Sequence, residues 1–480
     1  MPGCFASGNR ACDSSLVAAT QTEGGAAGRA ASLFEASRPL SPSIHLVAAG
    51  TSRLVLVPNG SQVFEVDEDT FGQLDSARLT HDGRAIELFL QNLGVDEPQL
   101  VDDSAPLDPP LRALSLAVAQ RCNLGCTYCY AQQGSFGDVP KSMPLATALK
   151  AVDLLFAETN PGERVNLAFL GGEPLINRGV IRAATEHSQR RADESRTTVT
   201  FSITTNGTLV KEEDSDFFEQ HGFAVTISLD GGQAEHDKLR PFAGGRGSYQ
   251  HILGRIAPLL ARQHRMQVSA RVTVTPVNLD LAGTLDEFIK LGFHSVGFSP
   301  MLSSPTGKGE LDHRHLALML DQMVSCGEKF IDKFIAGERY PFTNMVNAMR
   351  EIHRGTHRPY PCGAGAGYMG VSATGDLSAC HRFVGDDSGE MGNIEEGIDR
   401  DRQRSWLTDR HVHRQEPCRS CWARYLCGGG CHHEVINRGR PACDYIRGWL
   451  HFCLGAYARL SAERPDYFGS TSTTPQTFVP

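Results

Sequence analysis

Six short apolar runs, separated by stretches of helical periodicity, constrain the fold of this 480-residue chain more than any other feature. In one separating stretch, Leu145, Leu149, Val152 and Phe156 fall on one helical face. Strands that alternate with helices predict parallel βαβ units. Because the runs are apolar nearly throughout, we expect a parallel sheet that is buried on both faces. The runs are Leu114–Val118, Val165–Leu170, Val199–Thr204, Ala224–Leu229, Val268–Thr275 and Ser295–Phe298.

Six units are too few for a closed eight-stranded barrel, so the expected fold is α/β, a partial (β/α)6 barrel over residues 108–315. Parallel α/β domains bind their ligands at the carboxyl ends of the strands. Three motifs follow three of the runs at those ends: Cys122 follows the first run, Gly171-Gly172-Glu173 the second and Asn206 the third. We therefore expect these residues to share one site.

The chain on either side of this domain is organised differently. Two alternating apolar stretches flank Asn59-Gly60, which predicts a β-hairpin over Arg53–Val66. This hairpin belongs to a small region, residues 46–107, that either docks a substrate by β-augmentation or caps the barrel. Residues 1–45, which are rich in Ala, Gly and Ser and lack a compact apolar segment, are predicted to be disordered. The remaining expected parts are a helical linker (316–360), a cysteine-rich domain (361–460) and a tail (461–480).

Composition excludes some partners. The formal net charge is -9, which argues against nucleic acid as the main partner. No apolar run approaches the roughly 18 residues that a membrane span needs, so we expect no membrane association. Without an export signal, the expected location is the cytoplasm, a reducing compartment in which clustered cysteines indicate metal binding rather than disulfides.

The spacing Cys122-x3-Cys126-x2-Cys129 is the first cysteine motif. Three thiolates on one short loop can bind three irons of a [4Fe–4S] cubane. The fourth iron is then open to the amino and carboxylate groups of S-adenosylmethionine (SAM). The alternatives are a zinc site or incidental buried thiols, but zinc prefers four ligands with paired spacing.

A second group of cysteines lies near the C-terminus and includes a CxxC pair, Cys418 and Cys421, with Gly428-Gly429-Gly430 further on. Glycines between ligands allow tight wrapping of the chain around an inorganic core. The alternative is a structural zinc ribbon in a non-enzymatic interaction scaffold, which the CxxC pair favours and the number of cysteines does not. The ordered cysteines of this field are Cys362, Cys380, Cys418, Cys421, Cys427, Cys431 and Cys443.

With these motifs, the chain resembles the radical SAM superfamily over residues 114–300 and its SPASM branch beyond residue 360. The resemblance implies that Cys122, Cys126 and Cys129 hold the SAM-cleaving cluster. For Asn206 a helix cap is an alternative role, and for each arginine a surface charge. The residues that match SAM-contacting positions are Tyr128 (adenine), Gly171, Gly172 and Glu173 (methionyl ammonium), Asn206, Ser228 (ribose), and Arg240 and Arg271 (ribose or carboxylate).

The SPASM resemblance also implies two auxiliary [4Fe–4S] clusters with interleaved ligands. Cys362, Cys380 and Cys431 would bind the first auxiliary cluster, which leaves it one ligand short. Cys453 could complete this cluster, or the site could stay open for a substrate thiolate. Because Cys453 lies in an apolar, helix-like stretch, a buried core cysteine is its alternative role. The second auxiliary cluster would be bound by Cys418, Cys421, Cys427 and Cys443.

The residue after Cys380 departs from one branch of the family. Sulfatase-maturing enzymes carry an aspartate there that acts as a base, whereas this chain has His381. Oxidation that relies on that aspartate is therefore less expected. His381 could act as the base itself, or it could donate a hydrogen bond beside the cluster.

Longer stretches, among them CTYCYAQQGSFGD and CWARYLCGGGCHHEV, resemble the family of quinohemoprotein amine dehydrogenase maturation proteins. This resemblance implies an enzyme that joins cysteine sulfur to the methylene carbons of Asp or Glu side chains in a small Cys-rich protein. A flavodoxin- or ferredoxin-type protein would supply the electrons. The alternatives are a maturase of another Cys-rich peptide and a SPASM dehydrogenase that oxidises an alcohol or thiol side chain.

Overall fold

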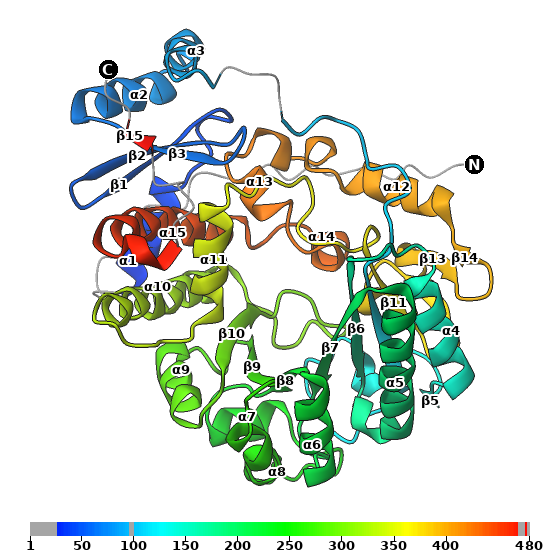
Figure 1. The fold of residues 1–480 in the computed structure, drawn as a ribbon. Helices are drawn as coiled ribbons and strands as arrows, with labels where there is room; N and C mark the ends of the chain where they lie inside the picture. The colour runs from blue at the N-terminus through cyan, green and yellow to red at the C-terminus, as the bar shows by residue number, and fades with distance from the viewer. Residues whose placement is uncertain (1–25, 96–99, 469–475, 478–480) are drawn as a thin grey trace, which may run out of the picture.

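The computed structural model describes residues 26–95, 100–468 and 476–477. All six predicted runs are strands of one sheet, parallel and in the order β10-β9-β8-β7-β6-β4, which confirms the α/β class. Figure 1 shows the sheet curving around one side, with helices outside it. The strands are β4 (Ala113–Gln120), β6 (Arg164–Gly171), β7 (Thr198–Thr205), β8 (Ala224–Ser228), β9 (Gln267–Val274) and β10 (Ser295–Pro300); a short β5 (Lys141–Ser142) pairs with β4.

The helices between these strands pack their apolar faces against the outside of the sheet. In α4, for example, Ala148, Val152 and Leu155 are buried in the main core. This packing explains why the intervening sequence carries helical periodicity. The helices are α4 (Leu145–Phe156), α5 (Arg178–Ser195), α6 (Glu212–His221), α7 (Gln233–Leu239), α8 (Tyr249–Ala261) and α9 (Leu281–Lys290).

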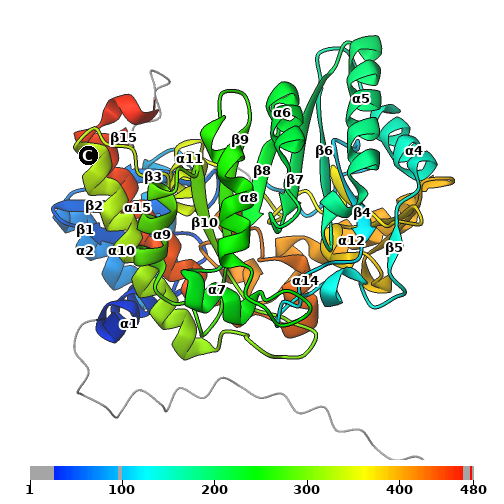
Figure 2. The ribbon, with the colours of Figure 1, turned by 90° about the horizontal axis from the view of Figure 1, so that it is seen from below.

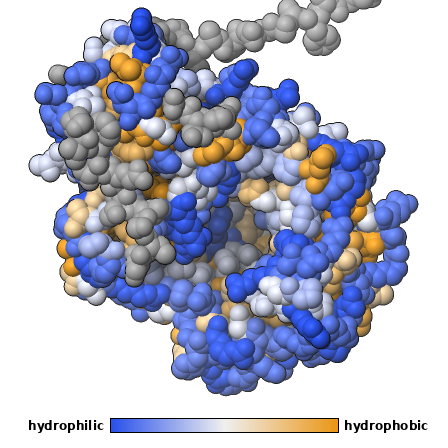
Figure 3. Space-filling model, turned by 45° about the horizontal axis from the view of Figure 1, so that its top comes forward, coloured by the Kyte–Doolittle hydropathy of each residue, from blue (hydrophilic) through white to orange (hydrophobic). Residues whose placement is uncertain are grey.

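The two faces of the sheet differ in burial. The expectation of burial on both faces is confirmed for β4, whose residues 114–120 are all buried, and it is wrong for β6, β8 and β9. Along β9, Val268 and Val272 are buried against the helices, whereas Ser269, Arg271 and Thr273 on the other face are not. The same alternation occurs in β6 and β8. Six strands curve without closing, so the concave face borders a hollow that side chains do not fill. Figure 3 shows a deep hollow near the middle of the molecular face that it presents.

The N-terminal region contains the predicted hairpin, in which β2 (Ser52–Val57) pairs with β3 (Gln62–Glu65). A further strand, β1 (His45–Ala49), pairs with β2, and β15 (Gln476–Thr477) lies parallel to β3 and occupies its outer edge. Helices α2 (Glu68–Leu79) and α3 (Gly83–Asn92) follow.

The predicted disorder of residues 1–45 is wrong for its second half, because residues 26–36 form helix α1 (Ala26–Ala36). Ala30 is fully buried in the main core, and Trp422 donates a hydrogen bond to the carbonyl of Ser37 at 2.9 Å. Residues 1–25 lie outside the described residues. Figure 2 shows α1 beside α10 and α15, so tertiary packing stabilises this Ala-rich segment.

The cysteine-rich part continues the main sheet rather than forming a separate layer. Strand β11 (Tyr368–Val371) pairs in parallel with β4, and β12 (Asp376–Ser378), β13 (Glu390–Asn393) and β14 (Gly397–Ile398) extend the sheet. Within the described ranges, no helix combines the length and apolar character of a membrane span. The helices of this half are α10 (His313–Ile335), α11 (Thr343–His353), α12 (Arg400–Arg410), α13 (Arg424–Cys427), α14 (His432–Arg438) and α15 (Cys443–Glu463).

Candidate functional site

Cys122, Cys126 and Cys129 lie on the loop that leaves the carboxyl end of β4, as the sequence predicts. The Cys122 sulfur accepts hydrogen bonds from the backbone N–H of Leu124 at 3.4 Å and from the Asn206 side chain at 3.7 Å. Burial raises the pKa of Cys126 to about 12; Arg240 opposes this rise, and the neighbouring thiols add to it. The loop therefore gathers three thiols around one position.

Gly171 and Gly172 bring the end of β6 against this loop. The N–H of Gly172 donates to the Ala119 carbonyl at 2.8 Å. A Cβ atom on Gly171 would lie 2.3 Å from the oxygen of Ala119, and one on Gly172 would lie 2.4 Å from that of Arg121. Only glycine permits this approach. The close contact expected from the sequence is thus made with the backbone that carries the cysteine loop.

Glu173 is fully buried and joins the ends of β6 and β7. Its Oε1 accepts hydrogen bonds from the Thr205 hydroxyl at 2.7 Å and the Leu175 N–H at 3.0 Å, and its Oε2 accepts from the Asn206 N–H at 2.8 Å. Burial raises the pKa of Glu173, while these hydrogen bonds lower it. All three donors belong to the chain itself.

Asn206 is not a helix cap, because the helix that follows it begins at Glu212 with Lys211 as its N-cap. Its side-chain oxygen accepts from the backbone N–H of Thr208 at 2.9 Å, which closes a local turn. Its amide nitrogen donates to the side-chain oxygen of Asn123 at 3.0 Å, within the cysteine loop. The residue therefore holds the loop in place from the end of β7.

Tyr128, Asp230 and Arg240 form a buried group on the other side of the loop. Arg240 donates to the Tyr128 hydroxyl at 2.6 Å, and this hydroxyl donates to Asp230. Asp230 also accepts from the Thr273 N–H at 2.8 Å. From the sequence, Asp230 is expected at the carboxyl end of the fourth apolar run, but the sequence assigns it no role in the site.

Arg271 and Ser228 lie apart from this group. They are opposite each other in the register of β8 and β9, on the concave face. Burial, the largest effect, and Arg382 lower the pKa of Arg271, whereas Glu434 and Cys431 raise it. The structure therefore places Arg271 toward the cysteine-rich part and does not bring it together with Arg240.

Cys362, Cys380 and Cys431 form a first thiol group. Burial raises the pKa of Cys380 to about 12, and Cys431 and Cys362 contribute to this rise. Arg382 links the group to the cysteine loop. Its guanidinium donates to the Cys431 sulfur at 3.6 Å and lies 5.4 Å from the centre of the Tyr130 ring, next to Cys129 in the chain.

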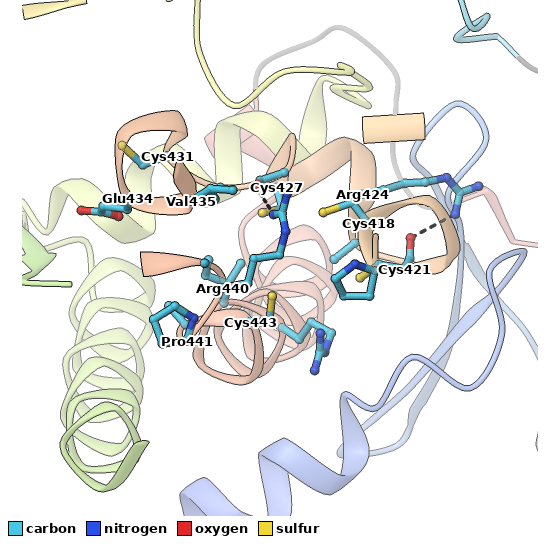
Figure 4. Close-up of a pocket in the computed structure, with 18 of the residues that line it drawn as sticks. Cys418, Cys421, Arg424, Cys427, Cys431, Glu434, Val435, Arg440, Pro441 and Cys443 are labelled. Carbon is cyan, nitrogen blue, oxygen red and sulfur yellow. Dashed lines mark hydrogen bonds between the residues drawn. The ribbon is translucent and has the colours of Figure 1, made fainter. Parts of the chain in front are cut away.

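A second thiol group surrounds a cavity of about 60 Å³. Figure 4 shows four sulfurs directed toward this space, with Arg440 between them and with Cys431 at the far end beside Glu434. Burial raises the pKa of Cys418 to about 12; Arg440 lowers it, and the other three thiols add to the rise. These four thiols belong to Cys418, Cys421, Cys427 and Cys443.

This arrangement weighs against a zinc ribbon. In the part of the chain that the structure describes, no three His, Cys, Asp or Glu side chains converge closely enough to hold a single ion. Thiols arranged around a cavity suit a larger inorganic core, such as a cubane. Gly428, with φ of +68°, turns the chain where a Cβ atom would lie 2.3 Å from the backbone of Tyr360.

Cys453 joins neither thiol group. It is fully buried in α15, and burial alone raises its pKa, whereas the thiols of the two groups also affect one another. This position favours the role of a core cysteine for Cys453 over that of a ligand of the first auxiliary cluster.

His381 makes a defined hydrogen-bond chain. Its Nδ1 and the Tyr368 hydroxyl are 2.7 Å apart, and the Tyr368 hydroxyl is 2.8 Å from that of Ser115 on β4. Burial lowers the pKa of His381 to about 4. The contact with the Tyr368 hydroxyl favours the hydrogen-bonding role for His381.

Comparisons with known proteins agree with this site. A family model described as the radical SAM superfamily matches residues 116–288. The serine-type anaerobic sulfatase-maturating enzyme of Klebsiella aerogenes is 25% identical over 355 residues, which cover 70% of this chain and 84% of that enzyme. The cysteine-type anaerobic sulfatase-maturating enzyme of Clostridium novyi (strain NT) is 27% identical over 353 residues, covering 67% and 88%. An uncharacterized protein of Methanocaldococcus jannaschii is 30% identical over 213 residues, covering 44% and 67%.

A solved structure shares the fold. Native anSMEcpe with bound AdoMet and Cp18Cys peptide superposes with a TM-score of 0.61 at 19% identity, covering 74% of this chain and 99% of that one.

The residues present fit the cofactors of the matching family, which are SAM and [4Fe–4S] clusters. Three thiols gather after β4, and the buried Nε of Arg240 has no acceptor among the described residues, so a polar ligand beside Cys126 would supply one. The sequence match, the order of the strands and the three-thiol loop agree with one another: this chain belongs to the radical SAM superfamily.

Proposed function

We propose that this chain modifies a ribosomally made, Cys-rich peptide or protein by joining a cysteine sulfur to a side-chain methylene carbon of Asp or Glu. The observation that carries the proposal is the composition of the first thiol group. Cys362, Cys380 and Cys431 supply three thiols, and Cys453 is held in the core of α15. A fourth ligand position is then available to the thiolate of a substrate cysteine.

The chain's own residues prepare this chemistry. When bound, the SAM-cleaving cluster and SAM would supply a radical that removes a hydrogen atom from an unactivated carbon, and an auxiliary cluster would accept the electron released when the thiolate sulfur bonds to that carbon. Cys122, Cys126 and Cys129 would hold that cluster, and the buried Glu173 network keeps their loop in one position. The polar concave face of the sheet borders the space between this loop and the first thiol group, where a peptide side chain would enter.

A second candidate function is the oxidation of a serine or cysteine side chain. It is favoured by the similarity to anaerobic sulfatase-maturating enzymes of both the serine and the cysteine type. Those relatives cover most of the barrel and the cysteine-rich part. Against it stands the residue after Cys380, which is His381 and not a carboxylate, and whose ring is engaged by the Tyr368 hydroxyl.

Intact mass, together with thiol and aldehyde counting, separates these reactions. The chain is co-expressed with a small Cys-rich protein, which is then alkylated and treated with a hydrazide probe. Each thioether should remove two hydrogens and one alkylatable thiol, without hydrazide labelling. Oxidation of serine also removes two hydrogens but keeps every thiol and creates an aldehyde. Oxidation of cysteine creates an aldehyde as well, but it removes one thiol and exchanges sulfur for oxygen with the loss of two hydrogens.

The control is a variant in which Cys122, Cys126 and Cys129 are all replaced by Ala. It should leave the peptide unmodified and produce no 5′-deoxyadenosine under strong reductant, because no chain thiol then holds the SAM-cleaving cluster. A hydrazide-reactive peptide with all its thiols intact would refute the proposal and support the second candidate.

A further inference from the structure

One positively charged side chain, that of Arg271, lies on the concave face of the sheet. Side chains alternate along each strand, so the residues of β9 that face away from the helices are Gln267, Ser269, Arg271 and Thr273. The corresponding positions of the other five strands carry small, apolar or uncharged polar side chains. The exception is Arg164, the first residue of β6, at the opposite edge of the sheet. Arg271 is thus the charged residue inside the curved face.

The side chains around Arg271 include an ion pair and a thiol of the first thiol group. The charged groups that affect it are Arg382, Glu434 and the thiol of Cys431. Arg382 already pairs with Glu434 at 2.8 Å. In the described part of the chain, no hydrogen bond or ion pair engages the side chain of Arg271. A second guanidinium therefore stands beside an ion pair that is already complete.

Arg271 is also accessible. Solvent reaches its side chain, although protein surrounds it on most sides, as expected for a residue that projects into a hollow. Its position lies between two centres. The carboxyl ends of the strands carry Cys122–Cys129, while Cys431 belongs to the first thiol group. A ligand held by Arg271 would lie near both.

We infer that Arg271 binds the side-chain carboxylate of the peptide's Asp or Glu and so determines which residue is presented for reaction. This inference rests on the proposed function. A guanidinium matches a carboxylate with two parallel hydrogen bonds, which fixes the orientation of the acid as well as its position. The reduced dielectric inside the hollow strengthens the pairing. The neighbours of Arg271 distinguish it from Arg240, which lies beside Tyr128 and Asp230.

The test compares two synthetic peptides, each with one cysteine, that differ only by Glu or Gln at one position. Their binding to the anaerobic holoenzyme is measured by fluorescence anisotropy for the unaltered chain and for Arg271→Gln, Arg271→Lys and Arg164→Gln. The unaltered chain should prefer the Glu peptide. Arg271→Gln should weaken Glu-peptide binding about tenfold to a hundredfold and leave Gln-peptide binding unchanged. Arg271→Lys should fall between, and the matched control Arg164→Gln should change neither.

Iron content and SAM binding are measured on each variant, since a folding defect would alter both. An equal loss for the two peptides, or no preference for Glu in the unaltered chain, would overturn the inference. Weakened SAM binding with normal peptide binding would overturn it too, and would assign Arg271 to SAM. Failure of the proposed function looks different: charge-dependent binding through Arg271 would persist while no thioether forms. If Arg271→Gln formed thioethers and bound the Glu peptide with undiminished affinity, the inference would be refuted and the proposed function would stand.

Discussion

A single buried carboxylate connects three parts of the SAM-cleaving site. Glu173 accepts hydrogen bonds from Thr205, Leu175 and Asn206, and Asn206 in turn contacts the Cys122 sulfur. Each donor is matched to an oxygen, so the network holds only while residue 173 offers acceptors alone. The residue that the family resemblance assigns to SAM binding therefore also positions the loop that carries the three thiols.

Glu173→Gln should lower the free energy of unfolding by about 1–3 kcal/mol, because its amide nitrogen would face groups that already donate. Chemical unfolding of the anaerobic protein measures the change. Glu87→Gln on the exposed face of α3 is the matched control and should change stability little. A Glu173→Gln protein as stable as the control would contradict the assigned network.

The iron content separates cysteines that bind clusters from those that pack the core. The reconstituted protein should hold about twelve irons per chain, three cubanes. Cys427→Ser should remove about four of them, because Cys427 belongs to the second thiol group. Cys453→Ala should retain all of them and lower only the stability. Loss of iron from Cys453→Ala would show that Cys453 is a ligand after all.

At the scale of elements, a buried aromatic cluster joins three segments that are distant in sequence. His45 of β1 stacks on Trp422 with ring centroids 3.7 Å apart, and its Nε2 lies 3.0 Å from Nδ1 of His451 on α15. Trp422 follows Cys421 directly, so the cluster connects the N-terminal sheet, the long C-terminal helix and the second thiol group. Only one hydrogen can occupy the His45–His451 contact, so the contact is lost when both rings are protonated.

Acid should weaken this junction. Burial lowers the pKa of His451 to about 4 and that of His45 well below its usual range. A histidine whose pKa is lower in the folded than in the unfolded chain contributes fully above about pH 6.5 and loses stability as the pH falls toward the folded value. The free energy of unfolding should drop by up to about 1.4 kcal/mol per pH unit for each histidine.

Urea unfolding between about pH 7.5 and about pH 5.5 measures this slope. His451→Phe should flatten it, whereas His264→Gln, at an exposed position, should not. An unchanged slope in His451→Phe would show that this junction does not cause the acid sensitivity.

Prediction from sequence succeeded for elements whose pattern is local. Each of the six strands is a short apolar run, and the hairpin carries its own turn residues. Helix α1 was missed because its Ala-rich sequence has little apolar character, and its stability comes from α10 and α15. The surroundings of Arg271 and the burial of Cys453 could not be predicted either, since they depend on contacts between segments far apart in the chain.

At the scale of the whole molecule, one core runs through all parts. Leu54 of the N-terminal sheet, Leu116 of β4 and Leu454 of α15 are buried in the same apolar cluster. The N-terminal region therefore has a structural role beyond any contact of its strands with a peptide. Removing it would uncover α15, which begins with a thiol of the second group, Cys443.

Leu54→Ala should lower the free energy of unfolding by about 2–5 kcal/mol, as expected for a cavity in a packed core. It should also reduce the retention of auxiliary iron during unfolding. Leu88→Ala, at a residue that is 57% exposed, is the matched control and should cost less than about 0.5 kcal/mol. If both variants lost the same amount of iron before they unfolded, the shared core would be contradicted.

Because β11 pairs with β4, the distance between the two metal-binding regions can change through this pairing only in discrete steps. Tyr368 lies opposite Ala113, and the side chain of Tyr368 reaches Ser115 and His381 on the concave side. A slip of one residue would turn every side chain of β11 to the opposite face. The smallest slip that keeps the faces is two residues, about 6.6 Å along the strand. Among related chains, loops and side chains can therefore change the distance between the two metal-binding regions gradually. The strand pairing can change that distance only by a full step of two residues.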